Sequence, residues 1–107
     1  MDIELEKKQD IVKVLIDGNI DAEGGRQLSV KFQEIMEMND VKKVILDLTT
    51  VKTITSSGIG KILNFFKYLD ARGGSIEINV ISDSLHEQFL EIHLDRIVPI
   101  KNNTLKV

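Results

Sequence analysis

Cysteine and tryptophan are absent from this 107-residue chain, and proline occurs only once. The absence of cysteine excludes disulfide bonds, thiol catalysis and thiolate metal sites. The chain also lacks an apolar run near the ~18–20 residues that a membrane-spanning helix needs. The N-terminal sequence MDIELEKKQD contains no apolar segment typical of a secretory signal. We therefore expect a cytoplasmic protein that does not insert into a membrane.

Basic residues are not in excess, since the net charge is −3 and the pI is about 5.3. A protein that follows phosphates along DNA or RNA normally carries a basic surface, so this charge balance argues against nucleic-acid binding. A chain of 107 residues has the size of one domain, with enough core to fold but little room for a deep substrate cleft. We expect one domain over residues 1–107, without a cofactor.

Hydrophobic periodicity divides the chain into strands and helices. Residues 41–48 form a short apolar run, which predicts a strand buried on both faces. The apolar face of the second predicted helix is expected to consist of Ile59, Ile62, Leu63, Phe66 and Leu69. The predicted strands lie near residues 3–6, 11–16, 41–48, 76–81 and 96–100, the predicted helices lie near 25–38, 59–72 and 82–92, and residues 101–107 form a loose tail.

This order of elements predicts the fold class. Strand–helix–strand units join parallel strands through right-handed crossovers. The first two strands are close enough in the sequence to pair as antiparallel neighbours. We therefore expect an α/β domain with a mixed, mostly parallel sheet, an antiparallel edge and about three helices packed on it.

The segment TITSSGIGK, residues 53–61, concentrates small residues between an apolar strand and an amphipathic helix. A phosphate-binding P-loop would need glycine where Thr55 stands and Ser or Thr where Ile62 stands. A dinucleotide-binding fingerprint would need glycine in place of Leu63. Both motifs fail, so the sequence argues against a nucleotide-binding loop.

A nucleophilic serine is disfavoured as well. A nucleophile elbow places glycine on both sides of the serine, whereas glycines only follow Ser56 and Ser57 here. The serine would also need a base, and nothing in the sequence brings His86 or His93 to it. We therefore expect that the protein is not an enzyme.

Two other roles fit the serines. Serine is a favoured N-cap, because its oxygen accepts a hydrogen bond from an orphan backbone N–H at the start of a helix. A serine there also lies at the positive end of the helix dipole, where the fold tolerates a phosphate. Phosphorylation adds about two negative charges. Such a change would repel a partner docked on that corner without unfolding the domain.

The segment VILDLTTVKTITSSGIGKIL, residues 44–63, resembles the signature of the STAS family, whose simplest members are bacterial anti-sigma-factor antagonists. An apolar strand is followed by Asp47, by the anchoring residues Val51 and Ile54, and then by the serine–glycine cluster. The segment IDGNIDA resembles a second marker of the family, in which Asp21 is the acidic residue after a glycine-containing strand end. The resemblance extends over nearly the whole chain and implies a single STAS-like domain.

The resemblance also implies a protein-interaction regulator. Family antagonists bind an anti-sigma factor with a histidine-kinase-type ATPase fold, and this binding releases the sigma factor. The anti-sigma factor is also a serine kinase, which phosphorylates the first serine of the motif and so breaks the complex; a serine phosphatase reverses the modification. Carried over to this chain, Ser56 is the phosphorylated residue, and Ser57 caps or supports it. The implied docking surface comprises Asp21, Thr55, Ser56, Ser57, Gly58, Gly60, Lys61, Asn64 and Lys67, with the glycines permitting close approach.

Two departures from the family pattern and one rival function stay open. Many antagonists have Asp immediately before the modified serine, whereas this chain has Thr55; Thr55 and Ser57 are alternative phosphorylation sites. The last residues are NNTLKV, where the family usually adds an amphipathic helix. The rival is a structural STAS subunit of a larger assembly, such as a lipid-transport complex or a stress-signalling scaffold, without a phosphorylation cycle.

Overall fold

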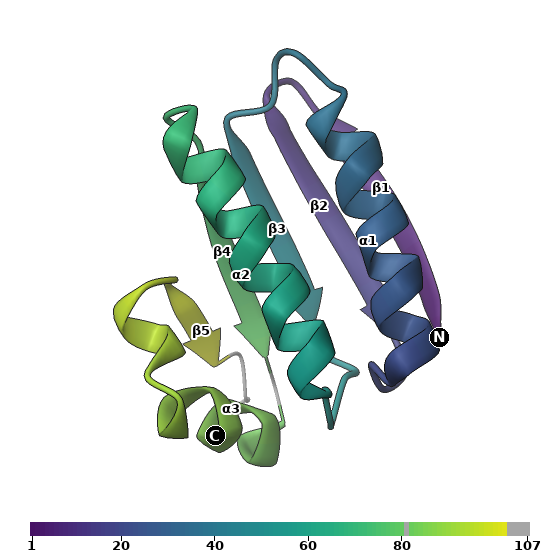
Figure 1. The fold of residues 1–107 in the computed structure, drawn as a ribbon, viewed down its shortest axis with the longest axis vertical. Coiled ribbons are helices and arrows are strands. Elements are labelled where there is room, and N and C mark those ends of the chain that lie inside the picture. The colour runs from purple at the N-terminus through teal and green to yellow at the C-terminus, as the bar shows by residue number, and fades with distance from the viewer. Residues whose placement is uncertain (81, 103–107) are drawn as a thin grey trace.

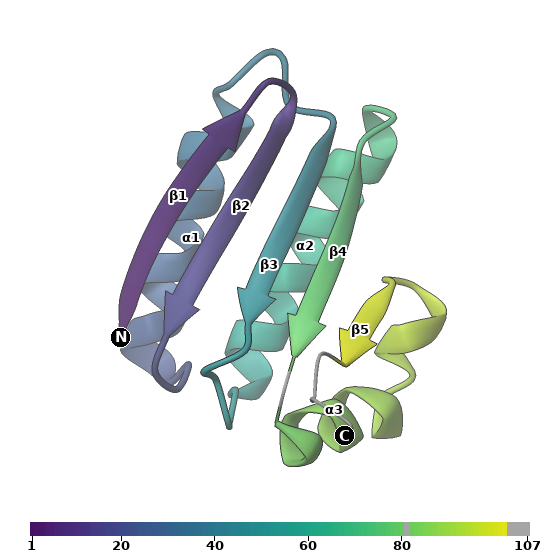
Figure 2. The same cartoon turned by 180° about the vertical axis from the view of Figure 1, so that it is seen from behind.

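A computed structural model describes residues 1–80 and 82–102, which form one β-sheet with helices packed on it (Figures 1 and 2). The order of elements is the predicted one, with a short 3-10 helix, η1, before the last strand. No helix in the described part of the chain is long and apolar enough to cross a membrane. The elements are β1 (Asp2–Lys8), β2 (Ile11–Asp17), α1 (Ala22–Met36), β3 (Lys43–Leu48), α2 (Ser56–Ala71), β4 (Ser75–Val80), α3 (Asp83–Glu91), η1 (Leu94–Arg96) and β5 (Ile100–Asn102).

The strands form one mixed sheet in the order β1-β2-β3-β4-β5. β1 and β2 pair in antiparallel orientation through a tight turn, in which Gln9 adopts a left-handed conformation with φ of 56°. The remaining neighbours pair in parallel, as helical crossovers between strands require. The predicted fold class is therefore confirmed. Because β2, β3 and β4 run in parallel, the loops that follow them meet at one edge of the sheet.

In residues 1–80 and 82–102, α1 and α2 cover one face of the sheet and leave the other without a helix. Figure 1 shows α1 and α2 on the same side, and the opposite view shows the strands uncovered (Figure 2). The prediction that residues 41–48 are buried on both faces is wrong, because burial alternates along β3. Its outward residues Lys43, Ile45 and Asp47 are only half-buried. Asp47 there pairs with Lys13 of β2, with a nitrogen–oxygen distance of 3.7 Å.

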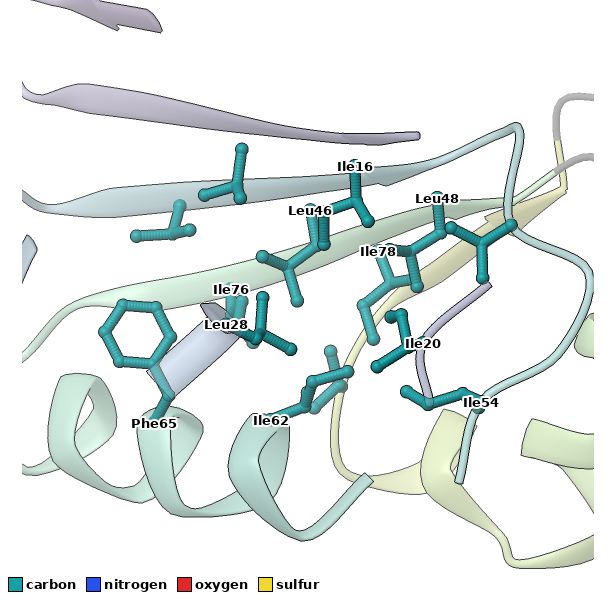
Figure 3. Packing of buried hydrophobic residues seen from close by; sticks show 14 of the residues in the cluster. Ile16, Ile20, Leu28, Leu46, Leu48, Ile54, Ile62, Phe65, Ile76 and Ile78 are labelled. Carbon is teal, nitrogen blue, oxygen red and sulfur yellow. The ribbon is translucent and has the colours of Figure 1, made fainter. Parts of the chain in front are cut away.

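The hydrophobic core fills the space between the helices and the inner face of the sheet (Figure 3). Leu46 of β3 and Ile78 of β4 are fully buried there beneath Ile62 of α2. The ring of Phe65 in α2 stacks on Phe32 of α1, with ring centroids 4.1 Å apart and planes 11° from parallel. This aromatic pair joins the two helices over the sheet.

The predicted apolar face of α2 is partly wrong. The residues that are buried in this helix are Gly58, Ile62, Phe65 and Leu69. Phe66 was predicted to face inward, whereas the structure buries Phe65. Both positions fit a helical spacing from Ile62 and Leu69, so periodicity does not distinguish them. The stacking of Phe65 on Phe32 of α1 decides between them. The predicted core residues that are only partly buried are Ile59, Leu63 and Phe66.

The C-terminal region departs from the prediction in its last strand. β5 begins directly after Pro99, and it includes Lys101 and Asn102, which were predicted to open a loose tail. These residues pair in parallel with Asn79 and Val80 of β4, and this pairing makes them part of the sheet. The rest of the predicted tail, residues 103–107, and position 81 at the end of a predicted strand lie outside the described residues.

Candidate functional site

Two loops meet beyond the carboxyl ends of β2 and β3 and lead into the helices that carry the predicted site residues. One loop joins β2 to α1; residues 49–55, called the connector below, join β3 to α2. An isolated parallel bridge between Ile20 and Ile54 ties the two loops together. Its hydrogen bonds run from the Ile20 N–H to the Thr53 carbonyl and from the Thr55 N–H to the Ile20 carbonyl, both at 3.0 Å.

The connector is anchored from its first residue onward. The Thr49 N–H donates to Oδ1 of Asp47 at 3.0 Å, which turns the chain away from β3. Val51 and Ile54 are buried, so the prediction that they anchor this segment inward is confirmed. Figure 3 shows Ile54 beside Ile20 at the edge of the core. The connector is therefore held between the core and the neighbouring loop.

Helix α2 begins directly after the connector, and its N-cap is Thr55. This residue has an extended backbone (φ −77°, ψ 161°), and its Oγ1 accepts a hydrogen bond from the Gly58 N–H at 3.2 Å. Ser56 and Ser57 are the first residues of the helix, and both are exposed. Within the ranges 1–80 and 82–102, neither serine hydroxyl has a hydrogen-bond partner. The prediction of a capping serine is therefore wrong, because the threonine takes that role.

Helix α1 begins beside α2. Its N-cap is Asp21, whose Oδ1 accepts a hydrogen bond from the Gly24 N–H at 2.7 Å. A Cβ added to Gly25 would lie 3.9 Å from Oγ of Ser57, so the first turns of the two helices are close neighbours. Figure 1 shows both helices starting at the same end of the sheet. We call the surface formed by Asp21 and residues 55–57 the Ser56 corner.

The two glycines of α2 have different surroundings. Gly58 is buried, and a Cβ on it would lie 2.8 Å from Cγ1 of Ile54 and 2.9 Å from Cγ2 of Ile20. Its missing side chain therefore lets α2 pack on the bridge inside the domain, and Gly58 is not an exposed contact for a partner. A Cβ on Gly60 would meet none of the described atoms within 4 Å. The fold itself thus gives no steric reason for glycine at position 60.

The remaining predicted residues lie further along α2. Asn64 and Lys67 are exposed, whereas Lys61 is half-buried. Residues three or four apart are neighbours on a helix surface. Gly60, Asn64 and Lys67 therefore share one face, which extends from the Ser56 corner along the outside of the helix.

The starts of the three α-helices in the described ranges differ in charge. Asp21 and Glu23 stand at the start of α1, and Asp83 lies in the first turn of α3. Carboxylates there stabilise the positive end of the helix dipole. The hydrogen bond that Arg26 donates to the Glu23 carboxylate, together with the charge of that carboxylate, raises the pKa of the Arg26 guanidinium. The first turn of α2 has no acidic residue, so the N-terminal end of this helix lacks a carboxylate.

The histidines belong to other surroundings. His86 lies in α3, where its Nδ1 is 3.1 Å from Nδ2 of Asn102. His93 precedes η1 in a left-handed conformation with φ of 59°. In the part of the chain that the structure describes, neither ring is hydrogen-bonded to Ser56, and no group of His, Cys, Asp and Glu could hold a metal ion. The geometry gives this serine no general base among those residues.

Two residues of the site were missed by the sequence reasoning. Oδ1 of Asn19 accepts hydrogen bonds from the backbone N–H groups of Lys52 and Thr53, at 3.1 and 3.2 Å. Nε2 of Gln88 in α3 donates to the carbonyl of Ile54 at 3.0 Å. An asparagine beside a glycine signals a turn. Neither side chain, however, has a sequence signal that identifies a partner more than thirty residues away.

The family profile of the STAS domain matches residues 2–106 of the chain. The chain belongs to the STAS family. This STAS chain is 32% identical over 108 residues to the anti-sigma-B factor antagonist of Listeria monocytogenes, covering 95% of this chain and 91% of that relative. The relative is named for its antagonism of another protein and not for catalysis, in agreement with the prediction of a regulator that is not an enzyme.

Solved structures show the same fold. The anti-sigma factor antagonist SpoIIAA in its unphosphorylated form has a TM-score of 0.81 and 19% identity, covering 95% of this chain and 90% of its own. The Bacillus cell fate determinant SpoIIAA in the phosphorylated form has a TM-score of 0.74 and 19% identity, covering 95% of this chain and 93% of its own. The STAS fold is therefore compatible with a phosphorylated state in that protein.

Proposed function

We propose that this STAS protein is an anti-sigma-factor antagonist controlled by phosphorylation of Ser56. In this proposal it binds, in the cytoplasm, an anti-sigma factor with a histidine-kinase-type ATPase fold, and the sigma factor is released. The same partner acts as a serine kinase on Ser56, the modified chain no longer binds, and a serine phosphatase restores it. The relatives named as antagonists and the phosphorylated SpoIIAA support this function.

The observation that carries the proposal is the state of the Ser56 hydroxyl. It is exposed, it has no hydrogen-bond partner in the described ranges, and the cap of its helix is supplied by Thr55. The fold therefore does not depend on this hydroxyl. A phosphate on it would lie at the N-terminus of a helix, where backbone N–H groups and the dipole favour negative charge. Modification can then change docking while the domain stays folded.

The docking surface in this proposal is the Ser56 corner and the exposed face of α2. Asp21 and Ser57 flank the modified serine, and Gly60, Asn64 and Lys67 continue the surface along the helix. Gly60 and Lys61 are half-buried, and Lys61 lies at the margin of this face, next to Gly60 in the sequence. Thr55 and Gly58 support this surface from within, through the cap and through close packing.

The position of Thr55 also accounts for the departure from the family pattern. Asp and Thr are both favoured N-cap residues, because each places a side-chain oxygen near the free backbone N–H groups. Threonine in place of Asp therefore preserves the start of α2 while it removes one negative charge from the corner. Phosphorylation of Thr55 would modify the capping oxygen itself, which makes Ser56 the less disruptive target.

The first test is direct mapping of the phosphate. The full chain is incubated with ATP, Mg²⁺ and a lysate of its own organism, and modified residues are identified by mass spectrometry. Ser57→Ala is the matched control, because it removes an exposed serine hydroxyl from the adjacent position. We expect phosphate on Ser56 in the wild type and in Ser57→Ala, and none in Ser56→Ala.

Other outcomes change the proposal in defined ways. Phosphate on Thr55 or Ser57 instead would keep the cycle and move its site. An unmodified chain that is recovered in complex with a membrane ATPase would favour the structural STAS subunit. Once the kinase is isolated, Ser56→Glu should abolish its binding; unchanged affinity would contradict docking on this corner.

A further inference from the structure

Asn19 is the residue that ties the connector to the neighbouring loop through its side chain. Its Oδ1 accepts from two consecutive backbone N–H groups of the connector, those of Lys52 and Thr53, at 3.1 and 3.2 Å. An amide oxygen has two lone pairs, so both are used by these bonds. One short side chain from the loop before α1 thus fixes two successive peptide groups of the segment that leads to Ser56.

The position of these bonds complements the backbone bridge between Ile20 and Ile54. That bridge holds the connector at its last residues, through the Thr53 carbonyl and the Thr55 N–H. Asn19 holds the N–H side of the same segment, at Lys52 and Thr53. The bridge and Asn19 thus hold adjoining backbone groups of the connector from the same neighbouring loop, directly before the capped start of α2.

The bonds of Asn19 lie on the surface, so their loss has a local effect. Asn19, Lys52 and Thr53 are exposed, and water can replace the asparagine at both N–H groups. A buried N–H left without a partner would destabilise the whole domain, but a solvated one costs much less. Asn19 therefore affects the conformation of the connector more than the stability of the fold.

A second amide side chain holds the connector from the opposite element. Nε2 of Gln88 in α3 donates to the carbonyl of Ile54 at 3.0 Å, in a half-buried position. Backbone groups at three consecutive positions, 52 to 54, are thus bonded by side chains of other elements. This arrangement preorganises the segment before any partner arrives.

We propose that Asn19 is a positioning residue for the Ser56 corner, which it holds in the form that a partner recognises. The part of this proposal that concerns the partner rests on the proposed function. Preorganisation raises affinity because less conformational freedom is lost on docking. Asn19 therefore acts on recognition of the corner and makes no contact with the reacting hydroxyl.

The two hydrogen bonds from the Lys52 and Thr53 N–H groups to Asn19, called the clamp below, are tested without a partner, with the full chain and the variants Asn19→Ala and Asn19→Asp. Aspartate keeps an acceptor oxygen at the same distance from the backbone, so it serves as the conservative rescue. Amide hydrogen exchange is measured by NMR at Lys52 and Thr53. We expect Asn19→Ala to speed exchange at these amides about five- to tenfold, as the loss of a hydrogen bond of ordinary strength implies. Asn19→Asp should restore wild-type exchange.

Two controls separate the clamp from a general loss of stability. The Thr55 amide, which donates to the Ile20 carbonyl, should exchange at the wild-type rate in Asn19→Ala. Trypsin, which cleaves after lysine, should cut Asn19→Ala faster after Lys52 and no faster after Lys31 in α1. Equal exchange at Lys52 and Thr53 in all three proteins would overturn the clamp, and so would an Asn19→Asp variant that behaves like Asn19→Ala.

The partner-dependent part is tested by the kinetics of phosphorylation of Ser56 by the kinase, once the kinase is isolated. A preformed corner predicts a KM about fivefold higher for Asn19→Ala, a nearly unchanged kcat, and rescue of KM by Asn19→Asp. A purely structural role would leave both constants at the wild-type values below the unfolding temperature. If wild-type Ser56 receives no phosphate, the proposed function fails and the recognition role fails with it, while hydrogen exchange still decides the clamp.

Discussion

The starts of α1 and α2 are built on one plan and differ in their charge. Each helix follows a parallel strand, each N-cap side chain accepts a hydrogen bond from the N–H three residues later, and that residue is glycine in both, Gly24 and Gly58. At α1 the cap is Asp21, with Glu23 close behind. At α2 the cap is the neutral Thr55, and no acid follows in the first turn.

Because of this difference, the start of α2 can accept additional negative charge, whereas the start of α1 already carries it. The start of α1 already carries carboxylates, so additional negative charge would be repelled. The start of α2 presents exposed serines to the same kind of dipole, without a carboxylate of its own. A reversible phosphate at α2 can therefore supply what α1 has permanently, which is why the comparison bears on the proposed switch.

The largest expected effect concerns the shared glycine position. Gly58→Ala should lower the free energy of unfolding by about 1–3 kcal/mol, because the new Cβ would overlap Ile54 and Ile20 in the core. Gly24→Ala should cost much less, because the atom nearest to the added Cβ would be Sδ of Met1, 2.7 Å away in a flexible side chain that can move. Urea unfolding of both variants measures the difference. Equal losses would show that the two helix starts are packed alike.

The next effect concerns the caps. Thr55→Ala should lower the free energy of unfolding by about 1 kcal/mol, since the Gly58 N–H loses its acceptor. Ser56→Ala should change it by less than about 0.5 kcal/mol, because the hydroxyl has no partner in the described ranges. Thermal or urea unfolding of the two variants distinguishes them. A larger loss for Ser56→Ala would mean that the serine, and not the threonine, caps α2 in solution.

The cap also illustrates how far the sequence could be read. The order of strands and helices follows from apolar periodicity, which is why the fold class could be predicted. Three hydroxyl residues in succession, at 55–57, all have the chemistry of an N-cap. The helix starts after Thr55 because Gly58 alone can approach Ile20 and Ile54, and that contact joins segments far apart in the sequence.

The other failures have the same physical origin. Phe65 and Phe66 are adjacent and equally apolar, and the ring of Phe32 in α1 decides which one is buried. The serine–glycine cluster could be singled out because its residues lie close together in the sequence, and Asp21 was added by the family resemblance. Asn19 and Gln88 could not, because their hydrogen bonds to the connector depend on how loops and α3 come together.

A smaller effect is expected at the second glycine of α2. Gly60→Ala should raise the free energy of unfolding by about 0.5–1 kcal/mol, because alanine has the higher helix propensity and the new Cβ meets open space. The same variant should weaken binding of the isolated anti-sigma factor, since a partner seated closely on this face would meet the methyl group. Unfolding and titration of the same protein sample test both halves. Binding at wild-type affinity would remove Gly60 from the docking surface.

The smallest effect tests the charge difference itself at matched positions. Ser56 is the first residue of α2, and Ala22 is the first residue of α1. Ser56→Glu should raise the free energy of unfolding by about 0.3–1 kcal/mol at low salt, because a carboxylate then faces the dipole of α2. Ala22→Glu should give no such gain, because the new charge lies between Asp21 and Glu23. In about 1 M salt the advantage of Ser56→Glu should disappear, because screening then acts within a few ångströms. If both variants gain equally, the acids at α1 do not distinguish the two helix ends, and tolerance of a phosphate on Ser56 would need another cause.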